Sequence, residues 1–171
     1  MKEKIINITK EVVPYILVIL LALFIRAFIA SPVRVNGTSM VDTLKEGDIL
    51  ILNKMNKNYK RFDIVVIDSN GTKIIKRIIG LPGENIEYKN NSLYINNKYV
   101  KDVAKEVTAD FSLEELYGYK MIPEGYYFVM GDNRDGSSDS RDKRIGLIKK
   151  SDIKGKAKFR IWPFNHFGKI K

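Results

Sequence analysis

Two residues of this chain have the chemistry of a serine/lysine hydrolase. Ser39 lies in the sequence GTSM, shortly after the one apolar segment of membrane length, and Lys76 lies in KRIIGLPGE. An alcohol becomes a strong nucleophile only when a base removes its proton, and a neutral lysine can be that base. The chain has no cysteine, which excludes disulfides and thiol catalysis. Its one histidine, His166, lies among aromatic residues at the carboxyl end, where a surface position is favoured over a catalytic triad.

Lys76 can act as a base only where its surroundings lower its pKa, because a lysine with the ordinary pKa of about 10.4 is protonated at neutral pH. In the sequence TKIIKRIIG, strand alternation puts Ile74 and Ile78 on the same face as Lys76 and Arg77 on the other. Branched apolar neighbours disfavour the charged form of lysine. The same pattern allows Lys76 to bend out into solvent or to pair with a carboxylate, and both alternatives stay open.

Two further stretches carry polar groups that a hydrolytic site would use. Gly37 permits close approach of the backbone before Ser39, whose own N–H could donate to an oxyanion, although GTSM also fits an ordinary polar turn. The stretch GDNRDGSSDSR follows directly on the apolar run YYFVM and predicts a hydrogen-bonded scaffold for a site. Its positions do not follow the order of a calcium loop, and we predict neither a metal nor a cofactor.

A single transmembrane helix is predicted from Val12 to Ala30, where Arg26 is the only charge. At 1.5 Å per residue this segment spans about 28 Å, the thickness of a bilayer core. A cleavable signal peptide would need small residues at the last and third-last positions before the cut, and Phe28 occupies the latter, so we favour a retained anchor.

The basic residues near the anchor indicate its orientation. The first 11 residues hold three lysines, whereas residues 31–50 hold two basic residues, which favours an amino terminus inside the cell. We therefore divide the chain into a cytoplasmic amino terminus (1–11), a transmembrane anchor (12–30) and an extracytoplasmic catalytic domain (31–171). The net charge of +10 comes from interspersed signs, which favours attraction to a lipid bilayer over nucleic acid binding.

The remainder of the chain has the pattern of a mainly β domain, an antiparallel sheet or partly open barrel. Short β-rich runs are separated by turn residues, namely DILILNK, FDIVVID, TKIIKRIIG, ENIEYK, SLYIN, KYV, YYFVM and KAKFRIW. The pairs Asn90-Asn91 and Asn96-Asn97 separate such runs, and asparagine tolerates the left-handed conformation of tight hairpins. The sequence SLEEL predicts a short helix capped by Ser112.

Taken in order behind an anchor, these motifs resemble those of the type I signal peptidases, specifically the shorter bacterial members with one anchor. GTSM followed by TL is similar to the nucleophile motif, KRIIGLPGE to the general-base motif, and GDNRDGSSDSR to the most distinctive stretch of that family. The ending GLIKKSDIKGKAKFRIWPF is also similar, so that the resemblance covers nearly the whole chain. It implies a mostly antiparallel β fold with a shallow groove that takes the substrate as an added strand.

The resemblance also implies a role for each site residue. Ser39 would attack the peptide carbonyl, Lys76 would take its proton and return it to the leaving amine, and Ser137 would orient Lys76. The other implied support residues are Gly37, Thr38 and Met40 around the nucleophile, Arg77 beside the base, and Asp132, Asn133, Arg134, Asp139 and Arg141 in the acidic motif. The expected partners are preproteins with small residues before the cut, the bilayer and, by proximity, the secretion machinery.

Three positions depart from the family pattern. Asp42 replaces the usual proline, and a carboxylate so near Ser39 would favour protonated Lys76, so that Asp42→Pro is expected to raise the rate near neutral pH. Gly37 stands where some longer members have a hydroxyl residue that donates to the oxyanion, whereas shorter members commonly have glycine there, so the oxyanion is expected to rely more on the Ser39 N–H. Glu84 is a conservative replacement of aspartate.

Two rival functions follow from the same residues. Asp42 motivates an inactive, membrane-anchored peptide-binding homologue. A self-cleaving repressor of the serine/lysine type would share the dyad, but it predicts a DNA-binding helical region before the serine, where this chain has its transmembrane segment. The sequence therefore favours a membrane-anchored serine endopeptidase that removes signal peptides.

Overall fold

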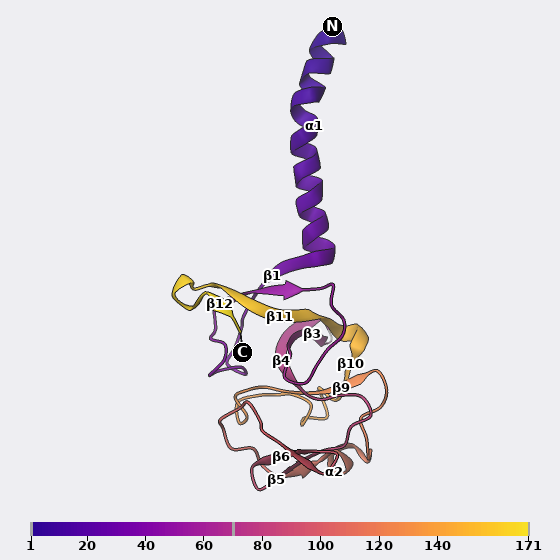
Figure 1. Cartoon of the computed structure of the whole chain (residues 1–171), viewed down its shortest axis with the longest axis vertical. Helices are drawn as coiled ribbons and strands as arrows, with labels where there is room; N and C mark the ends of the chain where they lie inside the picture. The colour runs from indigo at the N-terminus through magenta and orange to yellow at the C-terminus, as the bar shows by residue number, and fades with distance from the viewer. Residues whose placement is uncertain (1, 70, 171) are drawn as a thin grey trace.

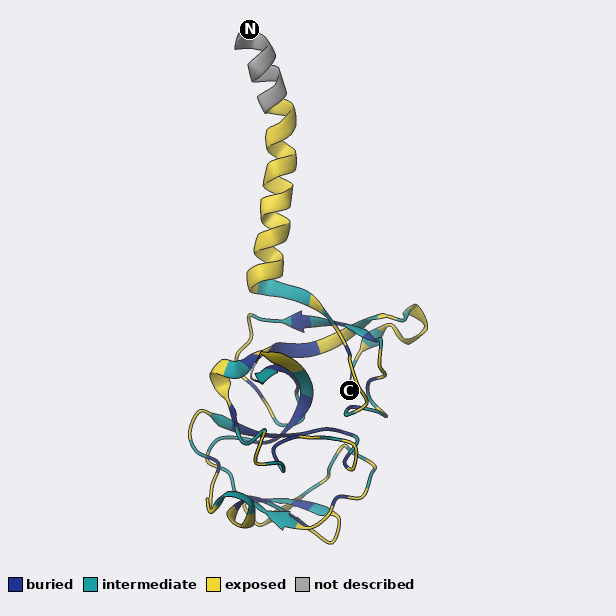
Figure 2. Cartoon of the chain, turned by 180° about the vertical axis from the view of Figure 1, so that it is seen from behind, coloured by how far each residue is buried: buried dark blue, intermediate teal, exposed yellow. Residues whose placement is uncertain are grey.

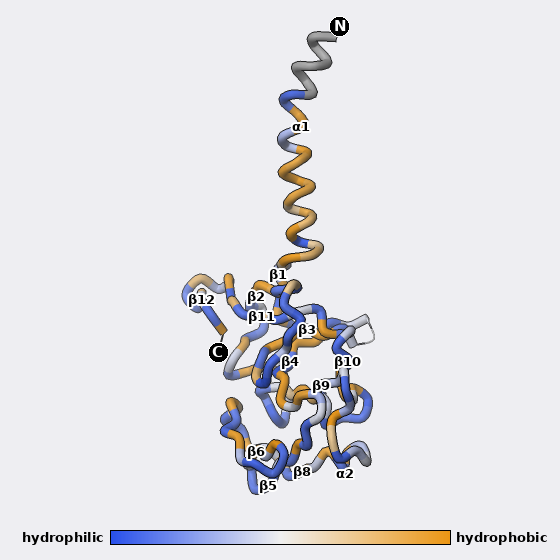
Figure 3. Tube along the Cα trace, turned by 45° about the vertical axis from the view of Figure 1, so that its right-hand side comes forward, coloured by the Kyte–Doolittle hydropathy of each residue, from blue (hydrophilic) through white to orange (hydrophobic). Residues whose placement is uncertain are grey.

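The computed structural model describes residues 2–69 and 71–170, with side chains described from residue 10 onward. A long amino-terminal helix, α1 (Lys2–Phe24), continues into one turn of π-helix, η1 (Ile25–Ile29), and projects from the body of the molecule (Figure 1). Within it the 20 residues Lys10–Ile29 are long and apolar enough to cross a bilayer. Nearly all the described residues of this helix are exposed and apolar, as the residue colours of Figures 2 and 3 show. The helix can bury this surface in another apolar medium, such as the core of a bilayer.

The larger of two antiparallel sheets lies next to this helix (Figure 1). Its strand order is β1-β2-β11-β3-β4-β9-β10, with β12 paired to β11. The strands are β1 (Ala30–Arg34), β2 (Ile49–Asn53), β3 (Ile64–Ser69), β4 (Thr72–Gly80), β9 (Tyr126–Met130), β10 (Ile148–Lys149), β11 (Ile153–Trp162) and β12 (Gly168–Lys169). Short 3-10 turns follow β10 and β11, at Lys150–Asp152 and Phe164–His166. β1 is an edge strand, where Pro32 removes no ladder hydrogen bond that a neighbour needs.

The smaller sheet lies at the end of the molecule far from the helix (Figure 1) and has the order β7-β6-β5-β8. Its strands are β5 (Ile86–Lys89), β6 (Ser92–Ile95), β7 (Lys98–Val100) and β8 (Phe111–Ser112). The predicted hairpins are confirmed, since both asparagines of each pair have positive φ, between 51° and 62°. The predicted short helix is also confirmed: α2 (Leu113–Tyr117) begins with a capping box formed by Ser112 and Glu115.

A shared apolar core joins the two sheets. Ile79, Phe128 and Met130 of the larger sheet pack in one buried cluster with Tyr88 and Leu93 of the smaller one. Two further clusters are formed around the larger sheet. One surrounds Val65, Ile78 and Val129, and the other joins the loop between β1 and β2 to buried residues of β2, β3 and β11. The mainly antiparallel β class with an amino-terminal apolar helix is thus confirmed, and the structure adds the division into two sheets.

Candidate active site

Ser39 lies in the loop between β1 and β2, which we call the nucleophile loop (residues 35–48). The loop is closed by backbone hydrogen bonds from Val35 N–H to Asp48 O at 2.8 Å and from Gly47 N–H to Val35 O at 2.9 Å. Gly37 has a φ of +83°, a conformation that glycine adopts without strain. Met40 is 2 % exposed and packs in the core beneath the loop. The buried Met40 fixes the loop, while Ser39 itself stays half-buried.

Lys76 lies in the middle of β4, opposite Val65 of β3, and only 3 % of it is exposed. The solvent-facing alternative for this lysine is therefore excluded. Its Nζ donates to Ser137 Oγ at 2.8 Å, and it forms no ion pair with a carboxylate among the described residues. Burial lowers the pKa of Lys76 to about 8, even though the negative charges of Asp139 and Asp132 act to raise it.

Ser137 connects Lys76 to a buried ion pair. Asp139 is fully buried, and its carboxylate accepts from Nε and Nη2 of Arg141 at 2.8 and 2.9 Å and from Gly131 N–H at 2.9 Å. Burial acts to raise the pKa of Asp139, but the hydrogen bonds from Arg141, Gly131 and Ser137 outweigh it and hold that pKa below its usual range. The ionised Asp139 thus orients the Ser137 hydroxyl, which accepts from Lys76.

Gly131 and Asn133 hold this cluster against the nucleophile loop. Asn133 N–H donates to Ser39 O at 3.1 Å, and Asn133 Nδ2 donates to Thr38 O at 3.2 Å. A Cβ on Gly131 would lie 2.4 Å from Ser39 O and 2.2 Å from Ser137 Oγ. The backbone at Gly131 therefore lies tightly between Ser39 and Ser137, the serine that contacts Lys76. Only glycine leaves room for that approach.

A second buried ion pair ties β4 to the nucleophile loop. Arg77 donates to both carboxylate oxygens of Asp132, from Nε at 2.8 Å and from Nη2 at 2.6 Å, and both residues are almost fully buried. Thr43 Oγ1 donates to Asp132 Oδ2 at 2.6 Å. The resemblance assigned no role to Thr43, although this residue lies four positions after Ser39 in the nucleophile motif. Arg160 of β11 also holds the loop, donating to Thr43 O at 3.1 Å and to Asp48 Oδ2 at 2.7 Å.

Arg134 differs from its neighbours in the acidic motif, because its side chain reaches into the smaller sheet. It donates from Nη1 to Tyr88 OH at 2.7 Å and to Thr108 Oγ1 at 2.6 Å, and its Nη2 lies 2.6 Å from Asp102 Oδ2. Arg141 Nη2 donates to Arg134 O at 2.6 Å, which links this anchorage to the cluster around Asp139. Arg134 thus holds the acidic motif in place and makes no hydrogen bond to Ser39 or Lys76.

The structure does not support the expected effect of Asp42 on the base. The charges that shift the pKa of Lys76 are those of Asp139, Arg141 and Asp132, and Asp42 is not among them. Asp42 also has a φ of +81°, which the ring of proline forbids. The structure therefore gives no support to the expectation that Asp42→Pro raises the rate, because proline cannot take the conformation that residue 42 adopts here.

His166 is exposed on the short 3-10 turn after β11. In the part of the chain that the structure describes, neither of its ring nitrogens makes a hydrogen bond, so nothing orients it as a catalytic base.

The acidic residues Asp132 and Asp139 each form an ion pair with an arginine. Glu84 closes its turn by accepting from Leu81 N–H at 2.7 Å and pairs with Arg61 at 2.6 Å, a structural use of the longer side chain.

The site as a whole can perform nucleophilic chemistry with a neutral amine as its base. Lys76 is buried, carries a depressed pKa and is aimed by a hydrogen bond to Ser137. Over the described residues, neither the hydroxyl nor the N–H of Ser39 is engaged in a hydrogen bond. Both groups are therefore available to a substrate, one as nucleophile and one as a donor to an oxyanion.

Comparison with known proteins identifies the family. Residues 8–162 match the family model described as signal peptidase, peptidase S26. The chain is 40% identical over 168 residues to signal peptidase I of Bacillus caldolyticus, covering 90% of this chain and 91% of the relative. It is 42% identical over 168 residues to signal peptidase I T of Bacillus subtilis (strain 168), covering 91% and 86% respectively.

A solved structure supports the same relationship. A crystal structure of a signal peptidase I from Enterococcus faecalis V583 is 41% identical and superposes with a TM-score of 0.53 over 58% of this chain and 96% of that one. The amino-terminal apolar helix is consistent with the membrane anchor of a signal peptidase I. Since the family model spans most of the chain and the relatives match almost end to end, this chain belongs to the signal peptidase I family of serine endopeptidases, peptidase S26.

Proposed function

We propose that Ser39 and Lys76 form the catalytic dyad with which this signal peptidase removes signal peptides from preproteins. Neutral Lys76 accepts the proton of the Ser39 hydroxyl as Ser39 Oγ attacks the scissile carbonyl, and the resulting ammonium protonates the leaving amine. A water molecule then hydrolyses the ester on Ser39, with Lys76 again as the base. The observation that carries this proposal is the burial of Lys76, whose pKa falls to about 8 and whose Nζ contacts Ser137 Oγ.

The surrounding residues have positioning roles in this proposal. Ser137, with Asp139 and Arg141 behind it, aims the Lys76 amine. Asn133 holds the Ser39 carbonyl, and the Ser39 N–H donates to the oxyanion. Asp132 and Arg77 fix the nucleophile loop through Thr43. Met40 anchors the loop, Gly37 and Thr38 shape its turn, and Arg134 holds the acidic motif to the smaller sheet.

Two unpaired strand edges near the dyad support binding of the substrate as an added strand. β1 lies at the edge of its sheet and leads into the nucleophile loop. β9 pairs with β4 at Arg77 and the residues after it, so that the part of β4 before Arg77 lacks a strand neighbour on that side among the described residues. An extended peptide can hydrogen-bond to such edges. Preproteins with small residues before the cut are the proposed substrates.

The proposed placement has the anchor in the cell membrane, the amino terminus in the cytoplasm and the catalytic domain outside. The charge bias at the two ends of the anchor supports it. In this placement the anchor holds Ser39 near the surface where a translocating precursor emerges, next to the secretion machinery.

The decisive experiment compares matched variants of the full chain in detergent micelles on a peptide with one Ala-x-Ala site. We expect Ser39→Ala and Lys76→Met each to lower kcat at least about 1,000-fold while leaving the fold intact. Lys156→Met is the control, because Lys156 is equally buried but pairs with Asp63 at 2.7 Å. Its folded fraction should still cleave. Substantial activity in Lys76→Met would refute the dyad, and specific binding without cleavage by the wild type would indicate the inactive peptide-binding alternative.

A further inference from the structure

The anchor helix continues into the larger sheet without a linker. Ala30, the residue after η1, is extended, with φ of −151° and ψ of 146°, and pairs with Asn53 in the ladder between β1 and β2. The N–H of Ala30 still donates to Ile25 O, so that one residue both ends the helix and begins the sheet. A flexible linker would let the helix and the body turn independently. Here the contacts at the junction decide the angle between them.

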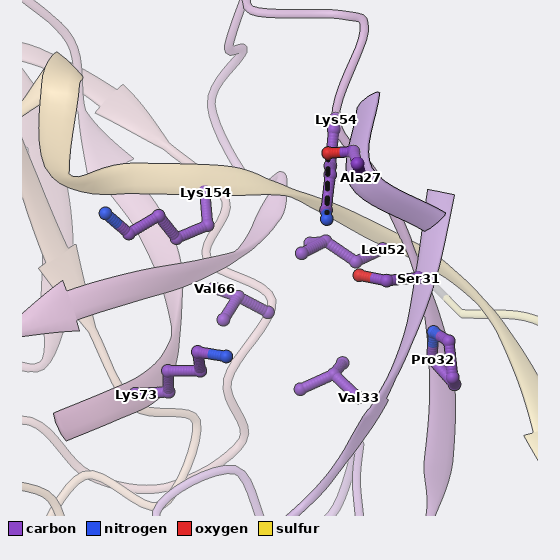
Figure 4. Close-up of a pocket in the computed structure, with 9 residues that line it drawn as sticks. All are labelled: Ala27, Ser31, Pro32, Val33, Leu52, Lys54, Val66, Lys73 and Lys154. Atoms are coloured by element: carbon purple, nitrogen blue, oxygen red, sulfur yellow. Dashed lines mark hydrogen bonds between the residues drawn. The ribbon is translucent and has the colours of Figure 1, made fainter. Parts of the chain in front are cut away.

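Lys54, the first residue after β2, contacts three carbonyl groups at this junction. Its N–H donates to Ile29 O at 2.9 Å, and its Nζ donates to Arg26 O at 2.7 Å and to Ala27 O at 3.3 Å. Figure 4 shows the Lys54 side chain and the hydrogen bond to Ala27. The last carbonyls of a helix have no partners within it, and a lysine there satisfies them and compensates the negative end of the helix dipole. Lys54 thus ties the last turn of the anchor to the sheet.

The membrane strengthens these hydrogen bonds. The apolar span Lys10–Ile29 is about 30 Å long at 1.5 Å per residue, which matches the hydrocarbon core of a bilayer. Its last turn therefore lies where acyl chains give way to head groups. A carbonyl without a partner costs more in such a medium than in water, and a hydrogen bond to it is stronger. The contacts of Lys54 thus hold the helix more firmly in a bilayer than in water.

The junction lies next to the region proposed for the substrate. A pocket of about 360 Å³ is bordered by Val33 of β1 and Lys73 of β4, on the two strands whose free edges we assign to the peptide, and by Ala27 and Lys54 at the junction (Figure 4). A precursor that leaves the bilayer passes the junction before it reaches Ser39. The height and tilt of the body above the bilayer therefore decide which peptide bond of the precursor meets the nucleophile.

We propose that Lys54 is a positioning residue, which clamps the end of the anchor to the larger sheet and thereby fixes the height and tilt of the dyad relative to the bilayer. A body that turned freely about Ala30 would present Ser39 to several peptide bonds of an embedded precursor. The clamped body presents it to one. This role rests on the proposed dyad and on the proposed placement of the anchor in a bilayer, and the first experiment below needs no catalysis.

The first experiment measures how firmly the junction is held. The chain has no cysteine, so Val18→Cys on the helix and Lys150→Cys on the body, both exposed positions, take one spin label each. Double electron–electron resonance on the full chain in lipid nanodiscs gives the distribution of distances between the labels. We expect a narrow distribution with Lys54 present and one about twofold broader in Lys54→Met. The matched control, Lys57→Met, removes the same charge from an exposed position on the same loop and should keep the narrow distribution.

The second experiment tests what the clamp does to cleavage. Precursors in vesicles carry one Ala-x-Ala site at increasing numbers of residues after their apolar segment, and the wild type should show a sharp optimum of this spacing. We expect Lys54→Met to broaden the optimum and to lower kcat/KM at it about tenfold, because small misplacements of the nucleophile are costly. Lys54→Arg keeps a charged donor for the carbonyls and should restore the optimum. A mere loss of stability would lower the rates at all spacings alike.

Several outcomes would overturn the proposal. A narrow distance distribution in Lys54→Met, or equal broadening in Lys57→Met, would show that Lys54 does not hold the junction. A broad distribution with an unchanged spacing optimum would show that the junction does not select the cut. A raised KM of Lys54→Met for a dissolved Ala-x-Ala peptide would assign Lys54 to direct contact with the substrate. If Lys54→Met does not fold, two glycines inserted between Ile29 and Ala30 release the same clamp, and this variant should show the broad distribution.

The clamp and the dyad fail separately. Ser39→Ala should keep the narrow distance distribution, because Ser39 makes no hydrogen bond to the junction among the described residues. A broad distribution in Ser39→Ala would contradict the clamp. Substantial cleavage by Ser39→Ala with a narrow distribution would refute the dyad and leave the clamp in place.

Discussion

Lys76 has neighbours that act on its pKa in opposite directions. Burial among apolar residues disfavours the ammonium form, whereas Asp139 and Asp132 favour it. Burial is the larger effect, and the pKa settles at about 8. A more strongly depressed pKa would give more neutral amine at pH 7 but a weaker base, so a value near the working pH suits general-base catalysis.

The pH dependence of cleavage follows from this pKa. At pH 7 only about a tenth of Lys76 is neutral, so kcat/KM should rise as pH increases, by nearly tenfold between pH 6 and 7, and level off above pH 8. Initial rates of peptide cleavage by the full chain between pH 6 and 10 measure this profile. A profile that is already flat at pH 6 would point to another base.

Asp42 gives a second prediction at the level of single residues. Its φ of +81° costs little for asparagine or glycine but is closed to proline. We expect Asp42→Pro to distort the nucleophile loop and lower cleavage at least tenfold, whereas Asp42→Asn and Asp42→Gly should keep the wild-type rate. Steady-state kinetics on all three variants would decide. A faster Asp42→Pro enzyme would show that the loop can refold into the usual turn of the family.

The segment directly after β9 connects the elements that carry the site. Its residues Gly131, Asp132 and Asn133 lie between the nucleophile loop and β4. Gly131 is the tightest point of this junction. A Cβ there would overlap Ser39 O and Ser137 Oγ, both within 2.4 Å. In the proposed dyad, a small displacement at this point separates Ser39 from Ser137, which holds the Lys76 amine.

Gly131→Ala should therefore abolish most cleavage. The methyl group must push apart two segments whose spacing the chemistry requires, and a shift of about 1 Å can cost 100-fold in rate. Gly118→Ala is the control, since Gly118 has a φ of +73° but open space around its Cα. That variant should lose about 1 kcal/mol of stability and retain its activity. Thermal unfolding and kcat measured on both variants would separate the effects, and equal losses of activity would contradict the prediction.

The whole molecule is a β body from which a helix projects, and the helical residues 10–28 are exposed (Figure 2). Two kinds of contact, apolar and polar, hold the body together. A shared apolar core joins the sheets, and Arg134 links the acidic motif to Asp102 and Thr108. The hydrogen bonds that join the helical segment to the body come from η1, for example from Lys54 N–H to Ile29 O at 2.9 Å.

Removal of the anchor should separate chemistry from targeting. A chain that begins at Ile29 keeps that hydrogen bond and should fold and cleave a dissolved peptide at close to the full-length rate. Cleavage of a precursor embedded in vesicles should fall by about 100-fold, because confinement to the membrane raises the effective substrate concentration. Comparing the two chains on both substrates measures the effect. Equal rates on the embedded precursor would show that the anchor does not recruit the substrate.

The sequence by itself determined β5, β6 and β7 of the smaller sheet, the asparagine hairpins between them and the capped α2, because each depends on residues close together in the chain. It did not predict β8, a strand of two residues. The ordered motifs also determined the family. Tertiary structure decided that Lys76 is buried and contacts Ser137, 61 residues away, and that Arg134 turns toward the other sheet. It also decided the left-handed conformation of Asp42. Alternation along a strand fixes which residues share a face, but only the packing of distant segments decides what covers that face and which group a buried side chain meets.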